Sequence, residues 1–263
     1  ITKGAYTHVL DCCTRIVRDG NEQPLDVDAR KALDGFYAAK GIEGFRVLGV
    51  ATRKSAPRPS YHHTDEKDMT FAGFLLFLDP IKADIMRTLG DLKRLGIRIK
   101  IVTGDNRYVA AHVAEGIGLD GKALLTGSEL HALSDEALWH RAERTDVFAE
   151  VDPQQKERIV RAFQRAGHAV GYLGDGINDA PALYEADVGI SVDQAVDVAR
   201  ESADIILLRR DLDVLKAGVE DGRRTFANTL KYISITTSAN FGNMLSMALA
   251  TLFVLTIASG LSF

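Results

Sequence analysis

Apolar and polar residues follow one another in alternating blocks along most of the chain. Short apolar runs occupy residues 71–78, 97–102, 147–151, 169–173, 187–192 and 204–208. Stretches with the apolar spacing of a helix separate them, such as residues 82–96 and 153–167. Strands that alternate with helices indicate βαβ units and a parallel sheet. The fold class we expect is therefore α/β, with a Rossmann-like parallel sheet over residues 71–221.

The amino-terminal residues follow a different pattern. Residues 45–53 alternate like a strand, and residues 26–41 have the spacing of a helix. Residues 55–69 are polar, contain proline and show no periodicity, which is typical of a loop or linker. We expect a partial α+β domain at residues 1–54 and a linker at residues 55–70.

The carboxyl-terminal residues lack charge. After Lys231 no charged residue follows, and this stretch is longer than the roughly 20 residues that a helix needs to cross a bilayer. Five basic residues precede its apolar part: Arg209, Arg210, Arg223, Arg224 and Lys231. Basic residues favour the cytoplasmic side of a span. We expect a stalk and transmembrane helix at residues 222–263, with residues 1–221 in the cytoplasm; a long buried helix is the alternative.

The overall composition excludes two classes of protein. The net charge of −4 gives no basic face for a nucleic acid, so we expect no nucleic-acid partner. The two cysteines, Cys12 and Cys13, are neighbours, and a bridge between neighbours is strained. A disulfide framework is therefore not expected, and a reducing compartment fits the chain.

Polar residues follow the apolar runs in a consistent way. The residues in question are Asp79, Thr103, Gly104, Asp105, Asp152, Lys156, Gly174, Asp175 and Asp179. Right-handed crossovers bring the carboxyl ends of parallel strands to one edge, where ligands bind. Carboxylates gathered there repel one another unless a cation lies among them, and Mg²⁺ prefers such oxygen ligands. The sequence predicts a Mg²⁺ site at Asp175 and Asp179; for Asp179 alone, a helix cap is the alternative.

Several motifs together resemble a known family. They are GDGINDAPAL at residues 174–183, TGDN at 103–106, KGA at 3–5, GFRVL at 44–48, ADVGISV at 186–192, SADIIL at 202–207 and GRRTFANTLKYI at 222–233. In this order they resemble the P-type cation-transporting ATPases of the haloacid-dehalogenase superfamily. The resemblance implies an ATP-driven pump of the cell membrane, multi-pass in the full protein, that works through an aspartyl phosphate. Its partners would be ATP, Mg²⁺, membrane lipid and the remaining domains of the same pump.

The resemblance also implies roles in handling the phosphoryl group. Asp175 and Asp179 would hold Mg²⁺, with Asp175 the more direct ligand. Thr103 and Gly104 would hold the phosphoryl group, and Lys156 would neutralise its charge. Electrostatic positioning of this kind carries most of phosphoryl-transfer catalysis.

A second set of residues would bind the nucleotide. Lys3 and Arg46 would contact ATP, and Asp105 and Asn178 would contact nucleotide or phosphate, next to Thr103, Gly104 and Lys156.

The chain departs from the family at two places. The aspartate that accepts phosphate lies in a DKTGT motif, which does not occur in residues 1–263. We therefore expect the acceptor to lie upstream, and this chain by itself to form no phosphoenzyme. Related calcium pumps carry an arginine where Glu150 stands, so we do not expect the phosphate contact of that arginine at this position.

The uncharged helix bears on the transported ion. Thr236, Asn240, Asn243 and Met247 are spaced to share one helix face, and polar groups in a membrane helix usually line an ion path or pack against another helix. Calcium pumps carry an acidic residue at the position of Asn243. The motifs are most similar to bacterial magnesium-transporting P-type ATPases, so we favour Mg²⁺ as the cargo. The alternatives are a calcium or other cation pump, a soluble haloacid-dehalogenase-type phosphatase, and a non-catalytic nucleotide-binding module.

Overall fold

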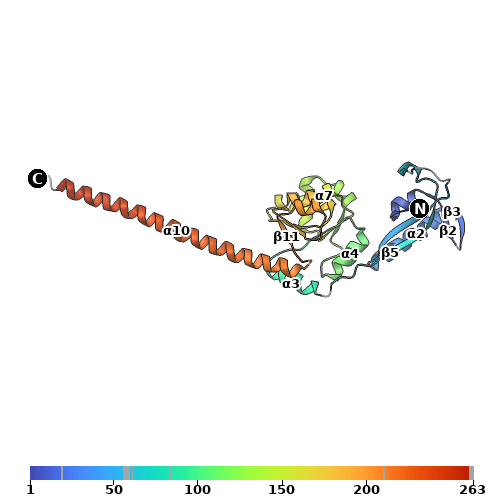
Figure 1. Cartoon of the computed structure of the whole chain (residues 1–263), viewed down its shortest axis with the longest axis horizontal. Coiled ribbons are helices and arrows are strands. Elements are labelled where there is room, and N and C mark those ends of the chain that lie inside the picture. Colours follow the sequence, from blue (N-terminus) through green and yellow to red (C-terminus); the bar gives the residue numbers. More distant parts are fainter. Residues whose placement is uncertain (19, 56–59, 61, 83, 210, 261–263) are drawn as a thin grey trace. The chain divides into compact units, whose positions relative to one another are not determined.

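The computed structural model in Figure 1 describes residues 1–18, 20–55, 60, 62–82, 84–209 and 211–260. They form two compact units, Ile1–Arg210 and Asp211–Phe263. The fold is mixed α/β, as expected, and the first unit contains one antiparallel-rich sheet and two parallel sheets.

The first unit begins with a five-stranded sheet. Its strands lie in the order β1 (Thr2–Ala5), β4 (Arg46–Thr52), β5 (Met69–Phe77), β2 (Cys13–Arg18) and β3 (Asn21–Pro24). Two helices, α1 (Tyr6–Asp11) and α2 (Val27–Ile42), contribute Tyr6, Leu10 and Ala29 to the core of this part. The side chain of Asp26 caps α2 by accepting a hydrogen bond of 2.7 Å from the Ala29 N–H. The strand and the helix predicted for this part are confirmed.

Strand β5 corrects one expectation. The apolar run at 71–78 was expected to open the parallel sheet, but β5 pairs antiparallel with β4 and parallel with β2. Its first residues are buried in the amino-terminal core, where Phe71 contacts Tyr6 edge to face. An apolar run alone cannot show which sheet it joins, because both sheets require the same side chains. Asp79 therefore follows a strand of the amino-terminal sheet; the domain boundaries otherwise stay a prediction.

The two cysteines lie in the same part. Cys12 and Cys13 are both free thiols, as expected. Burial raises the pKa of the Cys13 thiol to about 11, and its Sγ donates to the Val9 carbonyl oxygen. A thiol that stays protonated at neutral pH is a poor nucleophile.

The parallel sheets confirm the Rossmann-like expectation. One has the order β6 (Ile101–Val102), β8 (Val147–Ala149), β7 (Leu124–Thr126), and the other has the order β11 (Ile205–Leu207), β10 (Val188–Val192), β9 (Gly171–Leu173). The remaining elements of this unit are α3 (Ile85–Arg94), α4 (Arg107–Gly116), α5 (Gly127–His131), α6 (Asp135–Glu143), α7 (Pro153–Arg165), α8 (Ala180–Glu185), α9 (Asp197–Glu201) and the 3₁₀ turns η1 (His63–Asp65) and η2 (Ile177–Asp179). The core beside β8 contains Leu125, Leu138, Phe148 and Ile159.

Helix α7 is important for the site because it carries Lys156. It begins with a capping box, in which Asp152 accepts from the Gln155 N–H at 2.7 Å and Gln155 Oε1 accepts from the Asp152 N–H at 3.1 Å. Pro153 occupies the first turn, where its missing N–H has no cost. The buried side of the helix contains Lys156, Ile159 and Val160.

The second unit is one helix, α10 (Leu212–Gly260), of 49 residues (Figure 1). None of its described residues is buried, and one 18-residue window reaches a mean hydropathy of 1.8. The helix is therefore long and apolar enough to cross a membrane. It begins ten residues before the position 222 that the sequence pattern predicts for the stalk.

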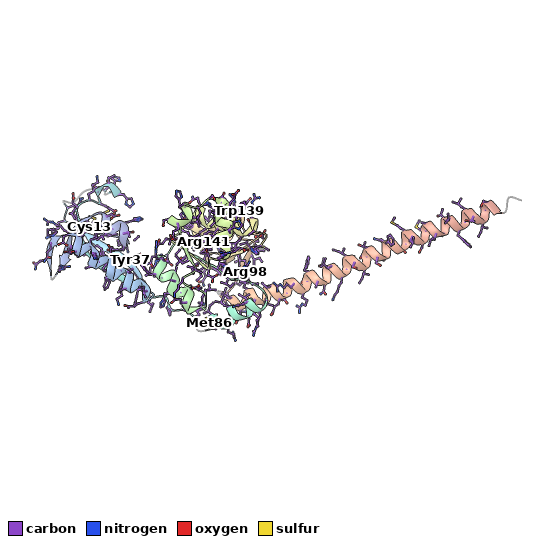
Figure 2. The ribbon with its side chains drawn as sticks, turned by 180° about the vertical axis from the view of Figure 1, so that it is seen from behind. Cys13, Tyr37, Met86, Arg98, Trp139 and Arg141 are labelled. Atoms are coloured by element: carbon purple, nitrogen blue, oxygen red, sulfur yellow. The ribbon has the colours of Figure 1, made fainter. Side chains whose placement is uncertain are left out.

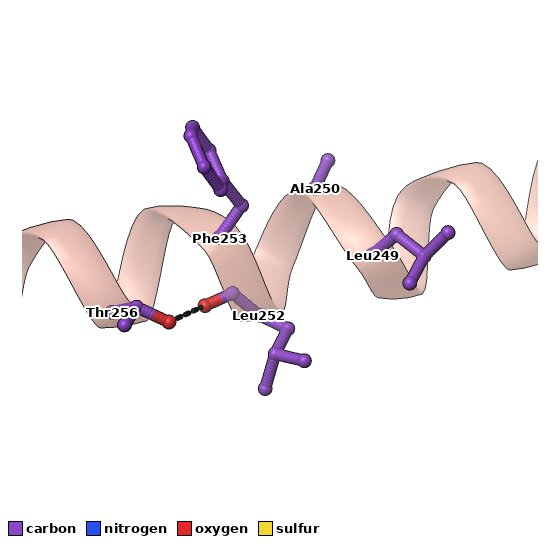
Figure 3. Close-up of a pocket in the computed structure, with 5 residues that line it drawn as sticks. All are labelled: Leu249, Ala250, Leu252, Phe253 and Thr256. Atoms are coloured by element: carbon purple, nitrogen blue, oxygen red, sulfur yellow. Dashed lines mark hydrogen bonds between the residues drawn. The ribbon is translucent and has the colours of Figure 1, made fainter.

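Hydroxyl groups in the apolar half of α10 are bonded within the helix. Thr256 Oγ1 donates to the Leu252 carbonyl oxygen at 2.6 Å, and Thr251 Oγ1 donates to the Met247 carbonyl oxygen at 2.9 Å (Figure 3 shows the first). Leu249, Ala250 and Phe253 surround this turn. Internal hydrogen bonds of this kind are what a helix in hydrocarbon requires of its polar groups.

Candidate active site

The turn that follows β6 forms the first part of the site. The Thr103 N–H donates to the Phe148 carbonyl oxygen at 2.8 Å, and the Thr103 carbonyl oxygen accepts from the Val151 N–H at 3.2 Å. Thr103 Oγ1 accepts from the Asp105 N–H at 3.1 Å and donates to Asp105 Oδ2 at 3.3 Å. These bonds fix the turn against the end of β8. Within this turn Gly104 is exposed, and it is one of the two residues, with Thr103, that are predicted to hold the phosphoryl group.

The second part is built around Asp179, after β9. Lys156 Nζ donates to Asp179 Oδ1 at 2.8 Å, and Tyr172 Oη donates to the same oxygen at 3.0 Å. The other oxygen, Oδ2, accepts from the Gly176 N–H at 3.0 Å. A Cβ at Gly174 would lie 2.5 Å from the Asp179 Cβ, so only glycine fits there. Lys156 comes from α7, so this pair joins the end of β8 to the end of β9.

Two titrations follow from this arrangement. Burial raises the pKa of Asp179, but the hydrogen bonds from Lys156 and Gly176 and the charge of Lys156 outweigh it, so the pKa is lowered overall. Burial, followed by the charge of Asp179, raises the pKa of Tyr172. At neutral pH the site therefore holds a carboxylate, and a phenol that donates to it.

The helix-cap alternative for Asp179 holds for the 3₁₀ turn η2 but not for α8. Asp179 is the residue before α8, yet its side chain makes no capping bond to that helix. It turns back to the Gly176 N–H and closes the 3₁₀ turn η2. The carboxylate is thus directed to Lys156 and the glycine turn.

The carboxylates can be tested for a fit to Mg²⁺. Three hydrogen bonds already use Asp179, whereas Asp175 is exposed and its backbone is fixed by a bond from the Val196 N–H to its carbonyl oxygen at 3.2 Å. Among the described residues, no three His, Cys, Asp or Glu side chains gather as a metal site. Mg²⁺ needs only one or two carboxylates beside water and phosphate oxygens, so these residues fit it. The Mg²⁺ site at Asp175 and Asp179, with Asp175 the more direct ligand, stays a prediction.

Two of the predicted nucleotide residues, Lys3 and Arg46, lie on one face of the amino-terminal sheet. In β4 the buried residues alternate with residues of the open face, and both Arg46 and Val50 belong to the open face. Lys3 of β1 pairs with Val50 and therefore lies on the same face. Lys3 and Arg46 therefore share that face, separated by four residues of strand, or roughly 13 Å. Asn178 is exposed in η2. The geometry agrees with a shared nucleotide role, which stays a prediction.

One contact links the two groups of predicted residues. Arg46 Nη2 lies 3.2 Å from Asp105 Oδ1, so the open face of the amino-terminal sheet meets the turn after β6. Asp105 thereby contacts both Thr103 and Arg46.

Sequence reasoning missed two participants. Tyr172 was included in an apolar run, although a tyrosine two residues before the GDG turn is a signal that a hydroxyl can reach the site. Arg107 was not singled out; it pairs with Glu150, the residue at which the family pattern breaks.

Comparison with known proteins decides the family. The sequence profile of the haloacid dehalogenase-like hydrolases matches residues 15–187, more than half of the chain. The chain belongs to the haloacid dehalogenase-like hydrolase family. Strands β6 to β9 and the predicted site residues Thr103, Lys156 and Asp175 lie within that match, and β10 and β11 follow it.

Relatives within the family include cation pumps. The chain is 47% identical over 255 residues to "Magnesium-transporting ATPase, P-type 1" of Salmonella typhimurium (strain 14028s / SGSC 2262), and equally to that of Escherichia coli (strain K12). It is 32% identical over 260 residues to the "Calcium-transporting ATPase" of Bacillus subtilis (strain 168). These matches cover 97% of this chain and only 28% or 29% of the relatives. The resemblance to P-type ATPases is confirmed, and the magnesium-transporting relatives are the more similar of these.

Proposed function

We propose that this chain is the catalytic and stalk portion of a P-type ATPase that moves Mg²⁺ across a membrane. The observation that carries the proposal is the buried Lys156–Asp179 pair, which joins the ends of β8 and β9 within a chain 47% identical to magnesium-transporting ATPases. Because the chain spans about 28% of those relatives, the whole pump includes segments beyond residues 1–263. Lipid and those segments would be its partners, and the first unit would be cytoplasmic.

Each residue has a task in the proposed reaction. Thr103 Oγ1 and the Gly104 N–H hold the phosphoryl group, and Lys156 balances its charge while Asp179 orients the ammonium group. Asp175 holds Mg²⁺, which supplies charge neutralisation to the phosphate oxygens when bound. Lys3, Arg46, Asp105 and Asn178 hold the nucleotide.

Each of the two parallel sheets has an edge strand that bears on the position of the acceptor aspartate. Among the described residues, β6 has no strand partner on the side away from β8, and β9 has none on the side away from β10. A further parallel strand beside them would end at the same edge as Thr103 and Asp175. We propose that the segment carrying the acceptor aspartate lies there, and that residues 1–263 by themselves form no phosphoenzyme.

The test uses the whole protein that contains this chain. Labelled ATP with Mg²⁺, followed by acid quenching, should give a stable phosphoenzyme, and Asp175→Asn should lower its amount at least about a hundredfold. Near-normal labelling of Asp175→Asn would remove this residue from the metal role. A wild-type protein that hydrolyses phosphate esters without any phosphoenzyme would favour a phosphatase, and one that only binds ATP would favour a binding module.

The cargo requires a separate measurement. The polar residues Asn240 and Asn243 would line the ion path on α10, and their uncharged side chains, with the 47% against 32% identity, favour Mg²⁺ over Ca²⁺. Vesicles containing the whole protein should accumulate or release Mg²⁺ when ATP is added. Movement of Ca²⁺ at equal or greater rate would support the calcium alternative.

A further inference from the structure

Glu150 has an unusual backbone at the end of β8. Its φ is +58°, and among the described residues only Asp68 is another non-glycine residue with positive φ. A side chain in this region is strained, and such strain is often found at functional sites. A Cβ on Gly127 would lie 2.2 Å from the Glu150 carbonyl oxygen, so glycine at 127 is what allows this conformation.

The strained conformation brings Glu150 to the turn after β6. The Glu150 N–H donates to the Asp105 carbonyl oxygen at 2.9 Å. Its carboxylate receives three bonds from Arg107, the first residue of α4: the backbone N–H and Nε donate to Oε1 at 3.1 and 3.3 Å, and Nη2 donates to Oε2 at 3.2 Å. The guanidinium is thus held by a two-point fork, the most specific geometry for an arginine and a carboxylate.

This pair lies beside both groups of predicted nucleotide residues. Arg107 follows Asp105 by two positions, and Asp105 pairs with Arg46 from β4. From α2, Tyr37 (labelled in Figure 2) packs its ring edge to face with Tyr108 at 6.4 Å. Burial raises the pKa of Tyr37, and the charge of Glu150 adds to this increase. The Arg107–Glu150 pair therefore adjoins the turn at which Asp105 contacts both Thr103 and Arg46.

The charges of the pair matter for an anionic ligand. Glu150 alone would repel phosphate, but Arg107 neutralises it and leaves its Nη1 N–H groups without another hydrogen bond or ion pair among the described residues. Arg107 is 45% exposed, so these donors are accessible to a ligand. An arginine has five N–H donors, and two of them suffice for the fork.

We propose that Arg107 is a nucleotide-contacting residue of this site, and that Glu150 is the positioning residue that holds its guanidinium beside the turn after β6. The ligand class is a nucleoside triphosphate, and the contact is from the guanidinium to its phosphate or ribose oxygens. The inference rests on the proposed function, because it assigns a contact within that nucleotide site. Related calcium pumps have an arginine at the position of Glu150. In this chain, Arg107 of α4 would supply the positive charge instead, and Glu150 would hold it in place.

The experiment compares two reactions of the whole protein. In Arg107→Ala, the ATP concentration for half-maximal phosphoenzyme formation should rise about tenfold, the effect of losing one charge-assisted hydrogen bond. Phosphorylation by inorganic phosphate, which needs no nucleotide, should stay within about twofold. Arg107→Lys keeps the charge and loses the fork, so its half-maximal concentration should lie between those of Ala and wild type. Glu150→Gln should raise it about threefold.

A matched control comes from the same domain. Arg161 forms a similar two-point pair with Glu185, through Nε at 3.0 Å and Nη2 at 3.1 Å, between α7 and α8. Arg161→Ala should leave the ATP concentration for half-maximal phosphoenzyme formation unchanged. This result would show that losing such a pair elsewhere does not weaken nucleotide binding.

Three results would overturn the inference. An unchanged ATP concentration in Arg107→Ala would remove the contact, and equal losses in both reactions would show a structural role only. A Glu150→Gln variant that behaves as Arg161→Ala would remove the positioning role. If the wild type forms no phosphoenzyme at all, the proposed function fails instead, and this outcome is distinct from the other three.

Discussion

Helices α7 and α10 belong to one chain but are stabilised in different ways. α7 has 13 residues and buries Lys156, Ile159, Val160 and Ala162. α10 has 49 residues, and none of those described is buried. α7 is amphipathic and packs its apolar side against its own unit, whereas the second half of α10 carries no charged residue and is not covered by other described residues.

The difference shows which of the two helices has its surroundings supplied by the described residues. α7 holds a buried cation because Asp179, Tyr172 and the surrounding core supply its environment. None of the described residues of α10 is buried, and the helix is long and apolar enough to span a membrane, in agreement with the lipid contact proposed above. Changes in α7 should therefore affect chemistry and folding, and changes in α10 should affect membrane insertion.

The largest expected effect comes from removing the buried charge of α7. Lys156→Met leaves Asp179 as a partly buried carboxylate without its cation, which should destabilise the first unit by about 3 kcal/mol. Phosphoenzyme formation by the whole protein should fall at least about a hundredfold. Thermal unfolding and labelling with ATP measure the two effects.

The double variant Lys156→Met/Asp179→Asn serves as the control. It removes both charges, so it should recover much of the stability while labelling stays low. Recovered labelling in the double variant would show that Lys156 acts only in folding.

The second effect concerns α10. Phe253→Arg places a charge in the apolar half, which should make membrane insertion of residues 212–260 less favourable by about 3 kcal/mol. Phe226→Arg is matched to it, because the two phenylalanines are 65% and 68% exposed, but residue 226 lies among charged residues. The inserted fraction, measured with a glycosylation reporter in microsomes, should fall only for Phe253→Arg. Equal fractions would contradict a lipid-facing environment at residue 253.

The smallest effect is expected from Tyr172→Phe. It removes one of the three hydrogen bonds to Asp179 and should cost about 1 kcal/mol. The folded-state pKa of Asp179 is below its ordinary 3.8, so its contribution to stability is complete above that pH and is lost as the pH falls through the folded-state value. Tyr172→Phe should bring this acid loss to a higher pH, as measured by urea unfolding in detergent.

Tyr184→Phe on α8 provides the comparison, since this tyrosine is 84% exposed. Tyr184→Phe should lose stability at the same acid pH as the wild type. A shift in Tyr184→Phe as large as that in Tyr172→Phe would mean that the change does not arise at Asp179.

The sequence predicted the α/β class and the parallel sheets but not the pairing of β5, and the roles of its site residues stay predictions. The motifs around Thr103, Lys156 and Asp175 indicated the family from sequence alone. Such short motifs are recognisable because they depend on local backbone geometry and on fixed chemistry. The position of β5 was wrong, because an apolar run does not reveal a strand partner that lies far away in sequence. The Arg107–Glu150 pair spans 43 residues and depends on the backbone conformation at Glu150, which no local pattern shows.

Helix α10 also has mechanical properties. At about 1.5 Å per residue, its 49 residues form a rod of roughly 74 Å, more than twice the thickness of a hydrocarbon core of about 30 Å. A tilt of about 10° at its first turn would displace its last turn by roughly 13 Å. Gly218, Gly222 and Gly242 lack a Cβ, so the helix backbone is least restricted at these points. Small rotations at one end can thus be transmitted as large movements, with bending concentrated at the glycines.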